Sequence, residues 1–148
     1  MKKIEDTGIW LPLIVENRER GWTEEITAII NTGFRADIPI IAIANVLCIK
    51  LKIEKLDNLR TPTGRPIEWL YWTSERARVC LVLDNKVCRC VDNVRIVFAD
   101  RPYNLVNTFL ASRLGVGIYD PHEGSWFIRK ERCECLRIYP SAKPYMYY

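Results

Sequence analysis

The sequence predicts a mostly β domain with one or two short helices, and three observations carry this prediction. Short apolar runs separated by polar turns dominate the 148 residues. The 7 glycines and 8 prolines punctuate the chain evenly, with no repeat, low-complexity tract or linker. Apolar residues recur at helical spacing in only two short segments. These features indicate one compact domain over residues 1–148, large enough to bury a core without metals or disulfides.

The composition narrows the classes of function. The longest apolar run, Ile38 to Ile49, contains Pro39 and Asn45 and is too short to cross a membrane, so no membrane partner is expected. The lysines at the N-terminus have no apolar segment behind them, which is unlike a signal peptide and predicts a cytoplasmic protein. The chain has no glutamine but many isoleucine, arginine, lysine and glutamate residues, a bias typical of thermophiles.

The net charge of +4 comes from 22 basic and 18 acidic residues that are interleaved along the chain. The one basic-leaning stretch, Arg129 to Arg137, itself contains Glu131 and Glu134. A nucleic-acid footprint gathers basic residues on one face, so this pattern argues against nucleic acid as a partner. A basic nucleic-acid-binding β-domain stays open as a further alternative, which salt-dependent binding would favour.

The first elements form a hairpin. Gly8 to Val15 is predicted as a strand, Glu16 to Gly21 as a polar turn, and Thr23 to Ile30 as a second strand. The second strand ends in the triplet Asn31-Thr32-Gly33.

The next segment, Ile40 to Leu51, predicts a helix. Asp37 can cap its N-terminus, and Pro39 suits a first turn. Apolar residues recur at helical spacing along it, at Ile40, Ile43, Val46 and Leu47.

A turn-rich stretch from Leu59 to Pro66 then precedes a series of strands. The turn Asp84-Asn85 joins the second and third of them. The four strands are predicted at Ile67–Trp72, Arg76–Leu83, Lys86–Val91 and Val94–Ala99. Apolar and thiol side chains between Val87 and Val91 do not fall cleanly on one face.

A second helix is predicted from Leu105 to Leu114, with Gly115 as its C-terminal cap. Two further strands, Val116 to Tyr119 and Ser125 to Lys130, then flank the turn from Asp120 to Gly124.

Three of these pieces occur in an order that resembles the retropepsin-like aspartic proteases, the family of retroviral proteases and their cellular relatives. An apolar strand ends in Asn31-Thr32-Gly33, and a turn with Thr63 and Gly64 follows about thirty residues later. The segment from Asn104 to Gly115, which includes Val106 and Asn107, then forms a short helix. The family has apolar residues before Asp-Thr-Gly or Asp-Ser-Gly, a mobile flap hairpin, and an apolar pair followed by Gly before a short helix.

The resemblance covers roughly residues 11–129 and implies a closed acid-protease barrel. The domain core would span about residues 9–130, and residues 131–148 would form a C-terminal extension. In the family, each subunit of a dimer contributes one loop, and the two loops place two carboxylates side by side. Such a pair shares one proton, so that the ionised member activates a water while the neutral member polarises the peptide carbonyl.

This chain departs from that pattern at two positions. Asn31 stands where the family has its catalytic Asp, and an amide cannot act as a general base. Asn107 stands where the family has Gly, next to the place where it packs its active-site loop. Thr32 and Gly33 are kept: the threonine hydroxyl would cross-link the two loops, and glycine permits close backbone approach.

The resemblance therefore implies a homodimer without peptidase activity, in which the cleft holds an extended peptide as an added strand or has a structural role. The alternative is an active aspartic endopeptidase, with Asn31 as an engineered replacement of Asp or with Asp6 as the catalytic residue. Asp6-Thr7-Gly8 spells the family triplet, but it follows charged residues and lies before the first hairpin. The other interpretation of Asn31-Thr32-Gly33 is an ordinary turn after a strand.

Six cysteines occur in the chain, and two pairs have one residue between their members: Cys88 with Cys90, and Cys133 with Cys135. On strands, each pair would point to one face. We expect free or buried thiols first and disulfides next. Zinc comes last, since structural zinc sites favour two-residue spacers, so the sequence assigns no metal and no cofactor.

Two other features remain. His122 is the one histidine and falls in a turn, where a solvated side chain is the expected role. The aromatic end of the chain, Ile138 to Tyr148, carries more apolar surface than a free tail usually does. We expect it to pack on the domain or on a partner subunit.

Overall fold

The computed structural model describes residues 8–129 and 137–142. The described residues form strands and two short helices, in this order: β1 (Trp10–Asn17), β2 (Trp22–Asn31), β3 (Ile40–Ala44), α1 (Asn45–Lys50), β4 (Asn58–Arg60), β5 (Pro66–Leu83), β6 (Lys86–Ala99), β7 (Asn104–Asn107), α2 (Thr108–Arg113), β8 (Val116–Asp120) and β9 (Ser125–Ile128). The prediction of a mostly β chain with one or two short helices is confirmed.

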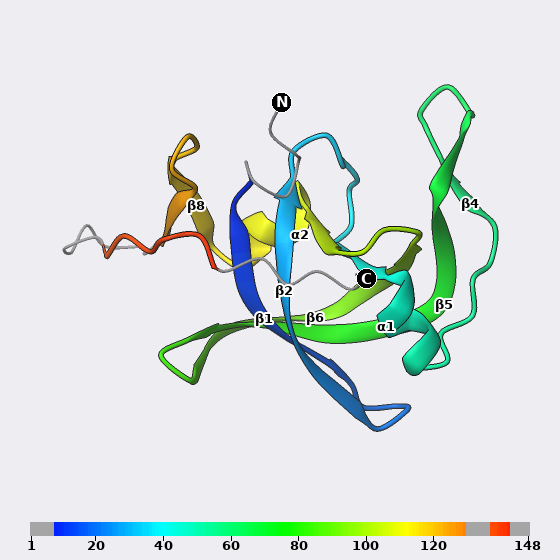
Figure 1. Ribbon diagram of the computed structural model, residues 1–148, viewed down its shortest axis with the longest axis horizontal. Helices are drawn as coiled ribbons and strands as arrows, with labels where there is room; N and C mark the ends of the chain where they lie inside the picture. The colour runs from blue at the N-terminus through cyan, green and yellow to red at the C-terminus, as the bar shows by residue number, and fades with distance from the viewer. Residues whose placement is uncertain (1–7, 130–136, 143–148) are drawn as a thin grey trace.

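Six of these strands close into a barrel (Figure 1). They follow the order β1-β2-β7-β3-β6-β5, and β5 pairs with β1 through Leu13↔Leu81 and Glu16↔Arg78 to complete the ring. β4 pairs with the outer side of β5, and β8 and β9 form a separate hairpin. The closed barrel that the resemblance implied is therefore present. Because its first strand pairs with its last, the barrel has no free strand edge.

Alternation along the strands produces two apolar clusters. Ile41 and Ile43 point into the barrel and belong to the larger cluster, whereas Ile40 and Ala42 point outward into a second one. The second cluster is covered by Phe34 and other residues of the connecting loops. β3 is consequently buried on both faces, and all five of its residues are inaccessible to solvent.

The predicted helix from Ile40 to Leu51 is wrong in its first half. Ile40–Ala44 is a strand that pairs parallel with β6 and antiparallel with β7, and only Asn45–Lys50 is helical. Asp37 and Pro39 accordingly precede a strand and do not begin a helix. A strand buried on both faces is apolar at every position, so apolar residues also occur at helical spacing by chance. The β-branched isoleucines favour the strand conformation at these positions.

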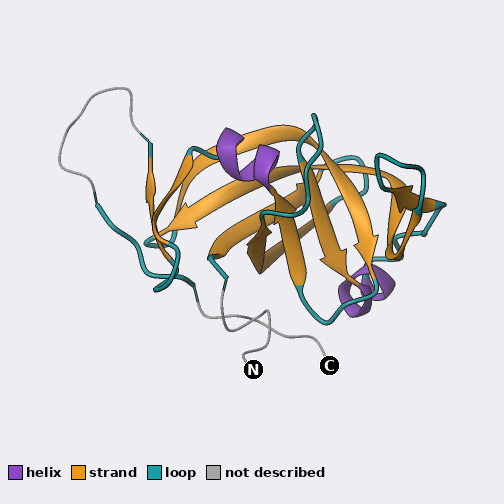
Figure 2. Ribbon diagram, turned by 90° about the horizontal axis from the view of Figure 1, so that it is seen from above, coloured by secondary structure: helices purple, strands orange, loops and turns teal. Residues whose placement is uncertain are grey.

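The predicted helix from Leu105 to Leu114 is wrong at its start. Asn104–Asn107 is strand β7, and the helix α2 spans only Thr108–Arg113. The C-terminal cap was predicted correctly, since Gly115 follows with a φ of 76°. Each short helix buries one side against the barrel core, through Leu47 in α1 and Leu110 in α2. Figure 2 shows the two helices at separate places against the strands.

The four strands predicted between residues 67 and 99 are two long strands, β5 and β6, joined by the predicted turn at Asp84-Asn85. Their pairing contains three register shifts. One shift falls between Leu81↔Arg89 and Val82↔Val87, so Cys88 is the extra residue of a β-bulge. This bulge explains why the side chains between Val87 and Val91 do not alternate cleanly.

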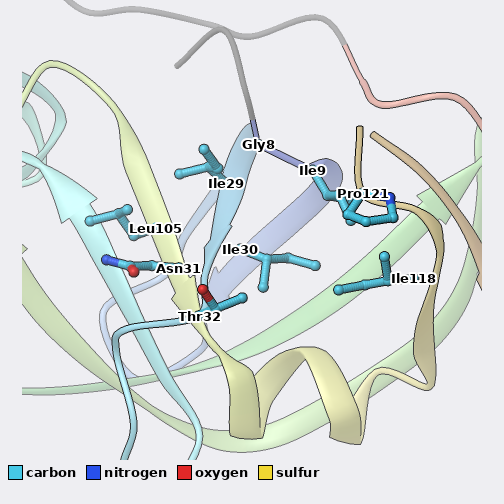
Figure 3. Close-up of a pocket in the computed structure, with 9 residues that line it drawn as sticks. All are labelled: Gly8, Ile9, Ile29, Ile30, Asn31, Thr32, Leu105, Ile118 and Pro121. Atoms are coloured by element: carbon cyan, nitrogen blue, oxygen red, sulfur yellow. The ribbon is translucent and has the colours of Figure 1, made fainter. Parts of the chain in front are cut away.

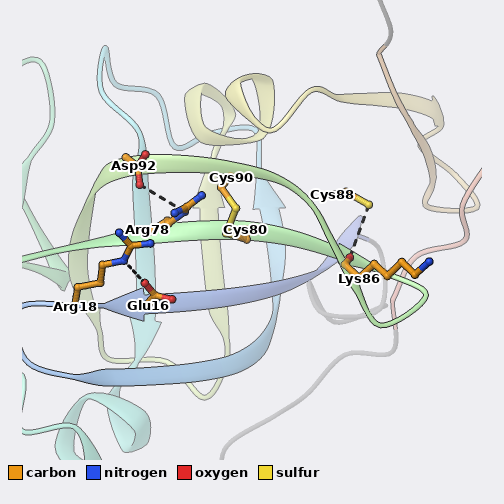
Figure 4. Close-up of a disulfide and its surroundings, with 8 residues drawn as sticks. All are labelled: Glu16, Arg18, Arg78, Cys80, Lys86, Cys88, Cys90 and Asp92. Carbon is orange, nitrogen blue, oxygen red and sulfur yellow. Dashed lines mark hydrogen bonds and ion pairs between the residues drawn. A yellow bond between two sulfur atoms is a disulfide. The ribbon is translucent and has the colours of Figure 1, made fainter.

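The expectation of free thiols is wrong for one member of the Cys88–Cys90 pair. Cys90 lies directly opposite Cys80 on β5, and the two sulfur atoms form a disulfide (Figure 4). Cys48 is a buried free thiol and Cys88 an exposed one. The second pair, Cys133 and Cys135, lies outside the described residues.

The end of the described chain crosses the β8–β9 hairpin and the start of β1, and we call residues 137–142 the strap. Tyr139 pairs with Trp126 of β9 through two backbone hydrogen bonds, and their rings stack with centroids 4.8 Å apart. The backbone N–H of Ala142 donates to Trp10 O. Of the two expectations for the segment from Ile138 onward, packing on the domain or on a partner subunit, the first is thus confirmed for residues 138–142.

Candidate functional site

The triplet Asn31-Thr32-Gly33 forms a tight turn at the end of β2. Asn31 Oδ1 accepts a hydrogen bond from the Gly33 N–H at 3.0 Å, and the Asn31 carbonyl accepts from the Phe34 N–H at 3.1 Å. The Phe34 carbonyl in turn accepts from the Thr108 N–H, which ties the turn to the start of α2. A Cβ at Gly33 would meet nothing closer than 3.4 Å, so space within the described chain does not demand glycine there.

The end of β2 lies beside the end of β7. The two strands are parallel, and their register places Asn31 opposite Asn107 and Ile30 opposite Val106. The topology therefore brings together two of the segments on which the resemblance rests, Asn31-Thr32-Gly33 and Val106-Asn107. They are separated by more than seventy residues in the sequence and meet because β7 inserts between β2 and β3.

Asn107 is completely buried and fully hydrogen bonded. Its Oδ1 accepts from the Ile40 N–H at 3.1 Å and from the Leu110 N–H at 2.9 Å, while its Nδ2 donates to the Ile38 carbonyl at 2.9 Å. One side chain thereby caps helix α2 and holds the chain that leads into β3. A glycine could make none of these contacts, which accounts for an asparagine at this position.

Asn104, which the sequence analysis did not single out, has the matching role at the other end of β7. It is also fully buried, with Oδ1 accepting from the Ala44 N–H at 2.8 Å and Nδ2 donating to the Thr27 carbonyl at 3.2 Å. The signal that could have identified it is the symmetry of Asn104-Leu105-Val106-Asn107, where two amides flank an apolar pair.

A cavity of about 300 Å³ opens at the end of β2 (Figure 3). Asn31 and Thr32 supply its polar wall, and the other lining residues are apolar or glycine. They come from the start of the chain, β2, β7 and the β8 hairpin: Gly8, Ile9, Ile29, Ile30, Leu105, Ile118 and Pro121. Volumes of about 300–1,000 Å³ with a few polar groups are typical of ligand sites.

Thr63 and Gly64 lie at the tip of the hairpin that joins β4 to β5, which projects from the barrel in Figure 1. Gly64 has a φ of 86° and donates its N–H to the Thr61 carbonyl, so the predicted turn is present. Neither residue lines the cavity at Asn31. In this single chain the structure therefore does not bring the two parts of the predicted site together.

The residues lining the cavity include no acid, base or thiol. His122 lies exposed in the β8–β9 turn, as expected, with its backbone N–H donating to Asp120 Oδ1. Burial, reinforced by the charge of Glu75, raises the pKa of the Cys48 thiol to about 12, so it is no nucleophile at neutral pH. Asp6 lies outside the described residues.

Within the described ranges, no three histidine, cysteine, aspartate or glutamate side chains gather as metal ligands. Neither described helix has the length and apolar character needed to cross a bilayer. Comparisons with protein-family models, with curated proteins and with solved structures found no match to this chain.

Proposed function

We propose that this chain is a retropepsin-like protein that has lost peptidase activity and binds an extended peptide, or acts structurally, as a homodimer. The observation that carries the proposal is the pairing of β2 with β7 inside a closed barrel, with Asn31 opposite Asn107 and an apolar cavity beside them. The sequence order of triplet, hairpin and short helix, which carried the resemblance, maps onto β2, β4–β5 and α2.

The loss of activity follows from the chemistry of Asn31. An aspartic peptidase needs one ionised carboxylate to take a proton from water and one protonated carboxyl to polarise the substrate. Two copies of this chain would contribute two neutral amides. The amide nevertheless keeps the turn intact, because its Oδ1 accepts the Gly33 N–H as a carboxylate oxygen would.

Replacing Asn31 by aspartate tests the proposal. We expect no cleavage of a denatured protein at acid pH by the natural chain, and cleavage that a pepstatin-type inhibitor blocks by the N31D variant. Asn85→Asp is the matched control: it makes the same chemical change in an exposed turn whose residues do not line the cavity, and it should leave the chain inactive.

Sedimentation of the natural chain, N31D and N85D should show a dimer in each case. Inhibitor-sensitive cleavage by the natural chain would contradict the loss of activity. An inactive, monomeric N31D variant would contradict the relationship to the family.

A further inference from the structure

A second hollow, which we call the seam groove, lies where strands β1 and β5 stop pairing. Its volume is about 500 Å³, within the range of about 300–1,000 Å³ that is typical of small-molecule sites. It shares no lining residue with the cavity at Asn31, and none of its lining residues is lysine, arginine or histidine. They come from β1, β2 and the β5–β6 hairpin: Pro12, Leu13, Ile14, Glu25, Ile26, Thr27, Val82, Leu83, Asp84 and Asn85.

The seam groove exists because the pairing that closes the barrel ends early. β1 and β5 pair only from Leu13↔Leu81 to Glu16↔Arg78, although β5 runs on to Leu83 and its hairpin with β6 extends past this point (Figure 1). The splayed strands leave the groove between them.

The backbone of β1 disfavours a further strand in this gap. Trp10 directs its N–H and its carbonyl to the strap, at Ser141 Oγ and the Ala142 N–H. Alternate residues of a strand direct these groups to the same side, so Pro12 directs its own toward the groove. Proline has no N–H to donate there, and a small ligand therefore fits the groove better than an added peptide strand.

The register determines which side chains form the floor of the groove. Ile14 lies opposite Glu25 and Pro12 lies opposite Thr27, so these side chains share one face of the β1–β2 pair. Val82 contributes from β5, on the other side of the gap. Because Pro12, Ile14 and Val82 are only half-buried, they leave apolar surface accessible to a ligand.

Two carboxylates give the groove a negative charge. Glu25 is exposed and forms no ion pair within the described part of the chain, whereas its neighbour Glu24 pairs with Lys50 at 3.1 Å. Asp84 already holds one cation, since Arg137 Nη1 lies 2.9 Å from its Oδ2. The ligand that complements this surface is positively charged at one end and apolar along the rest.

We propose that the seam groove binds a primary aliphatic amine, whose ammonium group pairs with Glu25 and whose chain lies across Ile14 and Val82. Such an amine titrates near the lysine value of about 10.4 and is therefore charged at neutral pH. A compact inorganic cation would leave the apolar floor uncovered, and an anion would meet two carboxylates. The inference does not depend on the proposed function, because Asn31 does not line this groove.

The test titrates the full chain, labelled with ¹⁵N, with n-octylamine at pH 7. Backbone signals of Ile14, Glu25 and Val82 should shift and saturate with a dissociation constant of about 1 mM, as expected for a few buried methylene groups and one exposed ion pair. Octanoate, with the same chain length and the opposite charge, should bind at least about fivefold more weakly. Ethylamine, which keeps the charge but lacks most of the chain, should not saturate at about 10 mM.

Four variants assign the binding to the groove. Glu25→Gln keeps the size of an exposed side chain and removes its charge, so octylamine should bind about threefold more weakly. Glu24→Gln, the matched control, makes the same change at a neighbour that does not line the groove and should bind like the natural chain. Val82→Thr, which makes the floor more polar, should weaken binding about twofold to fourfold. N31D should bind octylamine like the natural chain.

Equal affinity of the natural chain for octylamine and octanoate would overturn the inference, and this comparison needs no variant. It would also be overturned if folded E25Q bound octylamine as tightly as the natural chain, or if the shifted signals belonged to residues outside the groove. Should E25Q fail to fold, the comparison of the two ligands on the natural chain decides by itself.

Discussion

At the scale of single residues, Asn107 shows how a buried polar group can organise a site that it does not line. Its side chain joins three segments: the approach to β3, strand β7 and helix α2. Buried polar atoms are tolerated when all of them are hydrogen bonded, and this amide satisfies that condition. The position of the turn at Asn31 depends on it, because β7 lies directly beside β2.

Replacing Asn107 by alanine should lower the free energy of unfolding by about 3 kcal/mol, roughly 1 kcal/mol for each of three hydrogen bonds. Urea denaturation measures the change. Asn45→Ala is the control: among the described residues the Asn45 side chain bonds only to the next backbone N–H, and its loss should cost under about 1 kcal/mol. A loss below about 1 kcal/mol for Asn107→Ala would show that solvent or backbone movement replaces these bonds.

At the scale of elements, the longest pair of strands carries the most irregular register. β5 and β6 span 18 and 14 residues, and three shifts interrupt their ladder. The disulfide between Cys80 and Cys90 lies within this irregular part and holds these two residues opposite each other on the paired strands. A cross-link of this kind stabilises mainly by restricting the unfolded chain, and more so for a longer loop.

The double variant Cys80→Ala with Cys90→Ala should therefore unfold about 2–3 kcal/mol more easily, the loop-closure value for a sequence separation of 10. Urea denaturation under non-reducing conditions provides the measurement. Cys88→Ala, which removes the neighbouring exposed thiol and no cross-link, should change stability by under about 0.5 kcal/mol. Equal stability of the double variant and the natural chain would mean that the unfolded chain already keeps this hairpin together.

The two elements that the sequence misassigned have a common physical cause. Ile40–Ala44 and Asn104–Asn107 are short strands in the middle of the sheet, buried on both faces, so neither shows the alternation that identifies a strand. Their identity depends on pairing with distant segments, which periodicity along the chain does not encode. The outer hairpins were predicted well, because turn residues such as Asp84-Asn85 act locally.

The residues of the candidate site likewise fall into two groups: those that a local sequence pattern identifies and those that it does not. Asn31-Thr32-Gly33 could be found as a local pattern, and so could Val106-Asn107. The cavity could not, because Ile118 and Pro121 reach it from the β8 hairpin and Gly8 from the start of the chain. The disulfide was missed because Cys80 and Cys90 are neighbours only through the register of β5 and β6.

At the scale of the whole molecule, the strap connects parts that the barrel itself leaves separate. The barrel does not pair with the β8–β9 hairpin, which forms its own sheet. The strap contacts both, through Trp126 of β9 and Trp10 of β1. Because Ile118 of that hairpin also forms one wall of the cavity, the strap helps to hold the cavity together.

Two truncated chains test this role. One ends at Tyr139 and the other at Ala142, and both lack residues 143–148, so their difference isolates Pro140 to Ala142. These three residues make three hydrogen bonds. Pro140 O accepts from Trp126 Nε1–H, Ser141 Oγ accepts from the Trp10 N–H, and the Ala142 N–H donates to Trp10 O. The shorter chain should unfold about 2–3 kcal/mol more easily in urea, since each net hydrogen bond contributes about 1 kcal/mol.

The same two chains test whether the strap also supports the proposed dimer. Every contact of the strap named above lies within one chain, and a looser β8–β9 hairpin would expose a deformed cavity edge to the second copy. We therefore expect the chain that ends at Tyr139 to dissociate at higher protein concentration than the chain that ends at Ala142, as measured by sedimentation. Identical sedimentation of the two chains, together with the loss of stability, would confine the strap to a role inside one subunit.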